Sequence, residues 1–189
     1  IGLNLREGGG TGEGDPGGAR SAADDLAALT VMGRCRETRH RLVWTRAWCS
    51  PDVMTRRLEI APKLQDLADE GDLVIDASAA NHITGMADIC DTLRAASLLP
   101  EAGAIGLDPW GVAGLQDALE SRGFAADQIY GVGQGYRLNG AIKGLERRLM
   151  DRTIEHCGQE LLTWAVGNAE AEQKGNNVMI TKARAGVAK

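Results

Sequence analysis

The sequence lacks the cysteine and histidine spacing of a zinc site. It holds four cysteines and three histidines in 189 residues, and no two cysteines are separated by only two residues. Zinc ligands in small structural sites come in such closely spaced pairs. We therefore expect reduced thiols, as in a cytoplasmic protein, and no zinc centre. The isolated cysteines are Cys35, Cys49, Cys90 and Cys157.

Several other motifs are also missing. No apolar run approaches the roughly 18 to 20 residues that a membrane helix needs, and no signal-peptide pattern opens the chain. The phosphate-binding GxxxxGK loop of many ATPases and the GxSxG turn of serine hydrolases are both absent. The sequence thus predicts no membrane association and gives no support to those two classes of enzyme.

The composition is that of an ordinary globular protein, with 43% hydrophobic and 25% charged residues. A length of 189 residues is enough for one domain with a core. The chain starts at Ile1 without a methionine, and residues 185–189 have the composition of a loop. We expect residues 1–189 to be a single domain within a longer chain, truncated at its C-terminal end.

The charge is unevenly distributed. Residues 1–135 carry 12 Lys and Arg against 20 Asp and Glu, whereas residues 136–189 carry 9 against 6. The overall net charge of −5 argues weakly against a nucleic-acid-binding protein, but the basic end is where an anionic partner would bind. A basic stripe on the helix expected after Asn139 could contact such a partner or simply be a solvated face; it comprises Lys143, Arg147, Arg148 and Arg152.

The apolar pattern predicts an α/β fold. Strand-like runs at 1–5, 26–33 and 42–48 come first, followed by alternating helices and strands that include strands at 104–107 and 129–132. The short connection before residue 42 predicts an antiparallel hairpin. The expected architecture is a sheet with mixed strand directions, flanked by helices on its faces.

Helix signals add three local expectations. Ser50 followed by Pro51 predicts a helix start with Ser50 as its N-cap. Pro62 is expected to kink that helix. Asn139 is expected to cap a later helix.

Two strand ends resemble each other. Ile1-Gly2-Leu3-Asn4 and Ile105-Gly106-Leu107-Asp108 are apolar runs that end on a short polar side chain. Oxygen ligands at neighbouring strand ends suit hard cations such as Mg²⁺ and Mn²⁺. The alternative for Asp108 is a turn residue before Pro109. Asp25, which opens the next strand, could return beside Asn4, or it could be a solvated strand start.

These segments together resemble the nuclease domain of the large terminase subunit of tailed bacteriophages. The matching residues are spread over nearly the whole chain. They include Gly2-Leu3-Asn4-Leu5, Val43-Trp44-Thr45-Arg46-Ala47-Trp48-Cys49, Ile105-Gly106-Leu107-Asp108-Pro109, Gly133-Gln134-Gly135-Tyr136-Arg137-Leu138 and Trp164-Ala165-Val166-Gly167-Asn168-Ala169.

The resemblance implies an RNase H-like fold and an endonuclease that cuts double-stranded concatemeric DNA with two Mg²⁺ or Mn²⁺ ions. It implies that Asp108 is a catalytic, metal-binding carboxylate. Asn4 then stands where the family has an aspartate, and Asp25 matches an acidic residue at the second strand. The implied partners are double-stranded DNA, the terminase ATPase domain, the small terminase subunit and the portal, in the cytoplasm of an infected bacterium.

The sequence departs from the family pattern in ways that leave two interpretations open. Asn4 is not acidic, the Gly-rich stretch 6–24 is longer than the usual turn, and the third carboxylate is expected beyond Lys189. No ATPase domain is present. The first interpretation is a nuclease in which Asp25 or Asp15 supplies the missing charge. The second is a catalytically weakened module that binds DNA or docks on the portal.

Overall fold

The computed structural model of the chain describes residues 2–4 through their backbone, and residues 26–108 and 113–181. These residues form two compact units. Unit 1 comprises the described residues within 1–29 and 46–132, and unit 2 those within 30–45 and 133–189. The expected single domain stays a prediction, and Asp25 and the Gly-rich stretch 6–24 lie outside the described residues.

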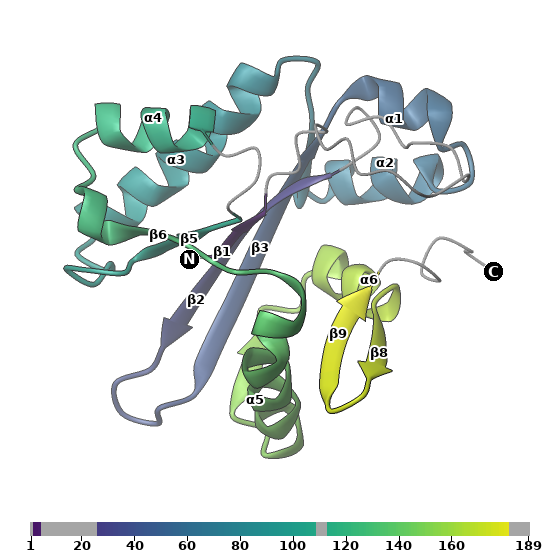
Figure 1. The fold of residues 1–189 in the computed structure, drawn as a ribbon. Coiled ribbons are helices and arrows are strands. Elements are labelled where there is room, and N and C mark those ends of the chain that lie inside the picture. Colours follow the sequence, from purple (N-terminus) through teal and green to yellow (C-terminus); the bar gives the residue numbers. More distant parts are fainter. Residues whose placement is uncertain (1, 5–25, 109–112, 182–189) are drawn as a thin grey trace. The chain divides into compact units, whose positions relative to one another are not determined.

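The described strands build a mixed sheet whose order is β4-β3-β2-β1-β5-β6 (Figure 1), with β7 also paired to β3. The parallel pairs are β1 with β5, β5 with β6, β3 with β4, and β3 with β7. The six residues between β2 and β3 are too few for a crossover, so these two neighbours form an antiparallel hairpin. The strands are β1 (Gly2–Asn4), β2 (Ala27–Arg34), β3 (Arg41–Cys49), β4 (Leu73–Ile75), β5 (Ile105–Leu107), β6 (Ile129–Gly131) and β7 (Ile154–His156). The predicted mixed α/β sheet is confirmed.

The core of unit 1 is aliphatic. Leu64 and Leu67 lie three residues apart on α2, and Leu115 and Leu119 lie four apart on α4, so each helix turns one apolar face inward. All four side chains are completely buried. Burying a leucine contributes roughly 1.5 to 3 kcal/mol, so these faces hold the helices in place. The helices of unit 1 are α1 (Pro51–Arg56), α2 (Ala61–Asp69), α3 (Ala79–Ala95), α4 (Ala113–Ser121) and the 3₁₀ turn η2 (Ala126–Gln128).

The first helical region corrects one expectation. Ser50 caps α1 as predicted, and its side-chain oxygen accepts the backbone N–H of Asp52 at 3.3 Å. Pro62, however, kinks nothing, because α1 ends at Arg56 and Pro62 lies in the first turn of α2. In the first turn of a helix the backbone N–H groups have no intrahelical acceptor, so the N–H that proline lacks is not missed there.

Unit 2 contains helical segments and a second, two-stranded sheet. These are η3 (Gly135–Leu138), α5 (Asn139–Met150), α6 (Glu160–Gly167), β8 (Glu170–Lys174) and β9 (Asn177–Thr181), with β8 and β9 antiparallel. Asn139 is not the predicted cap, because the N-cap of α5 is Leu138. Asn139 instead accepts the backbone N–H of Val178 through Oδ1 at 2.9 Å, so it ties α5 to β9.

Among the described residues, no helix combines the length and the apolar character that crossing a bilayer requires.

Candidate metal and nucleic-acid site

Asp108 is the best-defined candidate residue. It directly follows β5, whose three residues are all buried, and its own side chain is only 5% exposed. It is one of two buried polar residues in the described part of the chain; the other is Thr45. Burying a carboxylate is costly unless hydrogen bonds or cations stabilise it. Burial at a strand end therefore singles out Asp108 among the carboxylates of the described residues.

Asn4 occupies the equivalent place on the neighbouring strand. β1 runs parallel to β5, with Gly2 opposite Gly106 and Leu3 opposite Leu107. One further residue along each strand leads to Asn4 and Asp108. Adjacent strands lie about 4.8 Å apart, so the two positions are within reach of a shared cation. This is the adjacency at one sheet edge that the sequence pattern predicts; that both residues bind metal stays a prediction.

The sheet around Asp108 is tightly packed on the side of β6. Gly106 has no room for a side chain, because a Cβ there would lie 2.8 Å from Cγ2 of Val132 and 3.1 Å from Oη of Tyr130. The backbone N–H of Val132 donates to the carbonyl of Leu107 at 2.7 Å. The strand end that presents Asp108 is therefore held by both hydrogen bonds and side-chain packing.

The described residues do not complete a metal centre. Within them no group of three or more His, Cys, Asp or Glu side chains is placed to hold a metal ion. The predicted ligand Asp25 and the alternative Asp15 lie outside the described residues. A buried carboxylate beside a neutral amide position still fits the oxygen chemistry that Mg²⁺ and Mn²⁺ require.

The predicted basic stripe lies on α5 and just after it. Lys143, Arg147 and Arg152 are exposed, and Arg148 is half-buried. Lys143 and Arg147 share one face through their four-residue spacing, whereas Arg152 follows the helix with a φ of 53°. The Nζ of Lys143 donates to the carbonyl of Asn176 at 3.4 Å. The stripe is thus accessible, although its members do not form one straight row.

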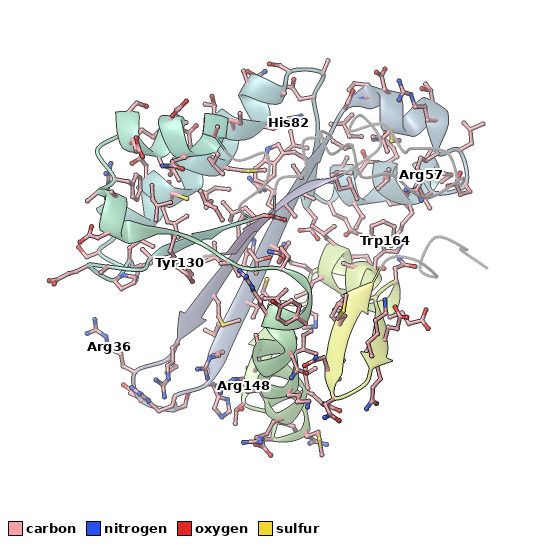
Figure 2. The ribbon with its side chains drawn as sticks, in the orientation of Figure 1. Arg36, Arg57, His82, Tyr130, Arg148 and Trp164 are labelled. Carbon is pink, nitrogen blue, oxygen red and sulfur yellow. The ribbon has the colours of Figure 1, made fainter. Side chains whose placement is uncertain are left out.

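Sequence reasoning missed a second group of cations, at the turn between β2 and β3. Four arginines occur within residues 34–41, and all belong to unit 2 together with α5. The pKa of Arg41 is lowered, first by partial desolvation and then by the positive charges of Arg148, Arg34 and Arg39. Figure 2 shows Arg36 extending from the turn and Arg148 on the flank of α5 next to β3. The dense run of arginines was visible in the sequence, but averaging over residues 1–135 hid it.

Backbone hydrogen bonds hold this turn and the end of α5 together. The N–H of Arg41 donates to the carbonyl of Thr153 at 2.9 Å, and the N–H of Thr153 donates to the carbonyl of Arg148 at 2.9 Å. Arg41 also pairs with Ile154 in the parallel register of β3 and β7. Near the turn, Nδ1 of His40 lies 3.1 Å from a carboxylate oxygen of Glu155.

The fold of this chain has a counterpart among solved structures. It is similar to the crystal structure of the HK97 bacteriophage large terminase, with a TM-score of 0.67 and 20% sequence identity. The match covers 96% of this chain and 34% of that protein, so this chain spans about a third of its length. No curated protein sequence matches the chain.

A sequence-family match completes the identification. The family model of the terminase large subunit, endonuclease domain, matches residues 61–186, which is two-thirds of the chain. The chain therefore belongs to the terminase large subunit endonuclease-domain family. The matched segment includes Asp108 and α5, whereas Asn4 and the β2–β3 turn precede it.

Proposed function

We propose that this chain is the DNA-cleaving part of a phage packaging terminase, a metal-dependent endonuclease that cuts double-stranded concatemeric DNA. The observation that supports it is the buried carboxylate of Asp108 at the end of β5, one strand away from Asn4. Family membership supplies the class of reaction.

The ligands of a Mg²⁺ or Mn²⁺ ion would be oxygens from the two strand ends. Asp108 contributes a negative carboxylate, Asn4 a neutral amide oxygen, and Asp25 is the candidate for a second carboxylate. When bound, such ions activate water for attack on the phosphodiester and stabilise the leaving oxygen. The protein's own part is to fix Asp108 on a rigid strand and to hold the duplex through the basic residues of α5, namely Lys143, Arg147, Arg148 and Arg152.

Asn4 favours a second candidate function. Two cations close together need negative ligands against their mutual repulsion, and an amide supplies none. In this alternative the domain binds DNA or docks on the portal but cleaves weakly. In both cases its partners are double-stranded DNA, the terminase ATPase domain, the small subunit and the portal, within the infected bacterial cytoplasm.

Cleavage of supercoiled plasmid in Mn²⁺ tests the proposal. We expect weak cleavage by the chain, stronger cleavage by Asn4→Asp, and none by Asn4→Asp combined with Asp108→Ala. Asp117→Ala removes an exposed carboxylate from α4 and serves as the matched control, with unchanged activity. If Asn4→Asp binds DNA but stays inert, the binding-module function replaces the nuclease. If the original chain already cuts efficiently, Asn4 is compensated by another carboxylate.

A further inference from the structure

The turn between β2 and β3 has the densest run of basic residues in the part of the chain that the structure describes. Residues 34–41 contain four arginines and one acid, Glu37. Arg34, Arg36 and Arg39 are exposed and Arg41 is half-buried. Arg39 adopts a φ of 64° within the turn. The segment is therefore a two-stranded ribbon that ends in positive charge.

These arginines differ from the paired arginines of unit 1. There, Arg57 pairs with Glu59 at 3.1 Å and Arg122 pairs with Asp88 at 2.9 Å. In the part of the chain that the structure describes, none of the four turn arginines forms an ion pair with a carboxylate, and Glu155 pairs with His40 instead. The positive charge of the turn is therefore not neutralised within the described residues.

The end of α5 adds to this charge. Arg148 lies near enough to Arg41 to disfavour its protonation, and the hydrogen bonds through Thr153 fix the two segments beside each other. Described residues of unit 2 carry 10 Lys and Arg against 7 Asp and Glu, whereas those of unit 1 carry 6 against 14. Positive charge is thus gathered in unit 2, and the turn is its densest point.

The helix dipole explains the positions of only some of these arginines. Cations in the last turn of a helix are stabilised by the helix dipole, which accounts for Arg147 and Arg148. It gives no reason for the arginines of the turn, which repel one another and belong to no helix. A partner of opposite charge would relieve that repulsion.

We propose that the β2–β3 turn, through Arg34, Arg36, Arg39 and Arg41 together with Arg148, contacts the phosphate backbone of duplex DNA. Guanidinium groups match phosphate oxygens in paired hydrogen bonds. A two-stranded ribbon is also narrow enough to follow a groove of the duplex. This surface extends the α5 stripe. Its contacts are to phosphates and not to base edges, so binding is independent of DNA sequence. The inference rests on the proposed function for its choice of DNA over other polyanions.

Fluorescence anisotropy with a labelled random-sequence duplex in EDTA tests it. The variant is Arg34→Gln with Arg36→Gln, since neither position has a positive φ or a side-chain hydrogen bond among the described residues. Losing two phosphate contacts should weaken binding at least about tenfold at low salt and make the log–log salt slope shallower by about 1.8. Replacing the same two residues by lysine keeps the charge and should preserve the slope.

The charge-matched control lies in unit 1. Arg56→Gln with Lys63→Gln removes two positive charges from α1 and α2, and binding should stay close to that of the parent chain. Binding by the turn variant equal to that of the parent would overturn the proposal, and it would assign the turn to an acidic protein surface. An equal loss in the control, or no duplex binding by the parent, would overturn it too.

Because EDTA removes divalent ions, this result is independent of cleavage. A weakened turn variant in a chain whose Asn4→Asp form never cuts supports the contact surface and rejects the nuclease. If the turn variant binds DNA like the parent, and cleavage depends on Asp108, the nuclease is supported and the contact surface is rejected.

Discussion

The side-chain amide of Gln159 forms two hydrogen bonds with the backbone of Thr45, one through its oxygen and one through its nitrogen. The N–H of Thr45 donates to Oε1 at 2.8 Å, and Nε2 donates to the carbonyl of Thr45 at 2.7 Å. β7 pairs with residues 41–43 of β3, and the N–H of Arg41 bonds in the same direction as that of Thr45. Alternate residues of a strand direct their backbone hydrogen bonds to the same side. Gln159 therefore continues the hydrogen bonding of β3 at Thr45, beyond the end of β7.

We expect Gln159→Ala to destabilise the fold by about 2 kcal/mol, because it leaves a partly buried N–H and C=O of Thr45 without these partners. Gln159→Glu should also destabilise, since a carboxylate cannot donate to the carbonyl. Urea unfolding followed by circular dichroism measures both. Gln173→Ala removes an exposed glutamine from β8 and should change the free energy of unfolding by less than about 0.5 kcal/mol. Equal stability of all three variants would show that the hydrogen bonds between Gln159 and Thr45 contribute nothing to the free energy of unfolding.

The strand-end pair predicts a charge effect on metal binding. Asn4→Asp should tighten Mn²⁺ binding on the order of tenfold, because a carboxylate adds the negative charge that an amide lacks. Titration calorimetry measures the change. Asn176→Asp adds the same charge at an exposed position between β8 and β9 and should have no effect. Unchanged affinity in Asn4→Asp would exclude position 4 as a ligand.

The α5 stripe predicts a loss of DNA affinity that is the same for every sequence. Arg147→Ala with Arg148→Ala should weaken binding to all duplexes alike and flatten the salt dependence by about 1.8 in log–log slope. Glu146→Gln on the same helix should strengthen binding slightly, because it removes a negative charge. Electrophoretic mobility shifts at several salt concentrations distinguish these outcomes. Parent-like binding by the double variant would leave the stripe as a solvated face.

Cys35 should be the thiol that becomes reactive at the lowest pH among those whose pKa is shifted. A hydrogen bond from the Thr38 side chain and backbone hydrogen bonds from Thr38 and Glu37 lower the pKa of Cys35 from 9.0 to about 7. Burial raises the pKa of Cys49 and of Cys90 to about 11. Only the thiolate reacts, so the alkylation rate of Cys35 should rise with pH and be half-maximal near pH 7.

Peptide mass spectrometry after brief iodoacetamide treatment follows the modification of each cysteine. Thr38→Val should shift the Cys35 profile toward higher pH, because the largest cause of the lowered pKa is gone. A Cys35 profile centred near pH 9 in the parent chain would contradict the prediction.

Two glycines predict opposite effects on stability. Gly106→Ala should destabilise by about 1 to 3 kcal/mol, because the added methyl would lie 2.8 Å from Val132. Gly144 lies in the interior of α5, and a Cβ added there would have no other atom within 4 Å, so Gly144→Ala should stabilise the fold by up to about 1 kcal/mol. Thermal unfolding of both variants measures the contrast. Similar melting temperatures would mean that β5 and β6 can move apart enough to accept a methyl group at position 106.

Local sequence pattern was sufficient where a residue's role depends on its near neighbours. The apolar runs that precede Asn4 and Asp108 predicted two strand ends, and Ser50 with Pro51 predicted the start of α1. β7 and β8 were missed, because they are short or polar and become strands only through pairing with β3 and β9. Pro62 was misjudged because the break after Arg56 was not visible in the apolar spacing.

The sequence by itself determined the family pattern, the apolar strands and the identities of Asn4, Asp108 and the arginines. Only the tertiary structure decided which of them are neighbours. The parallel register of β1 and β5 sets Asn4 beside Asp108 across about a hundred residues of chain, and β3–β7 pairing sets the arginine-rich turn beside Arg148. Strand register depends on hydrogen bonds and packing between distant segments, and a one-dimensional pattern does not contain those contacts.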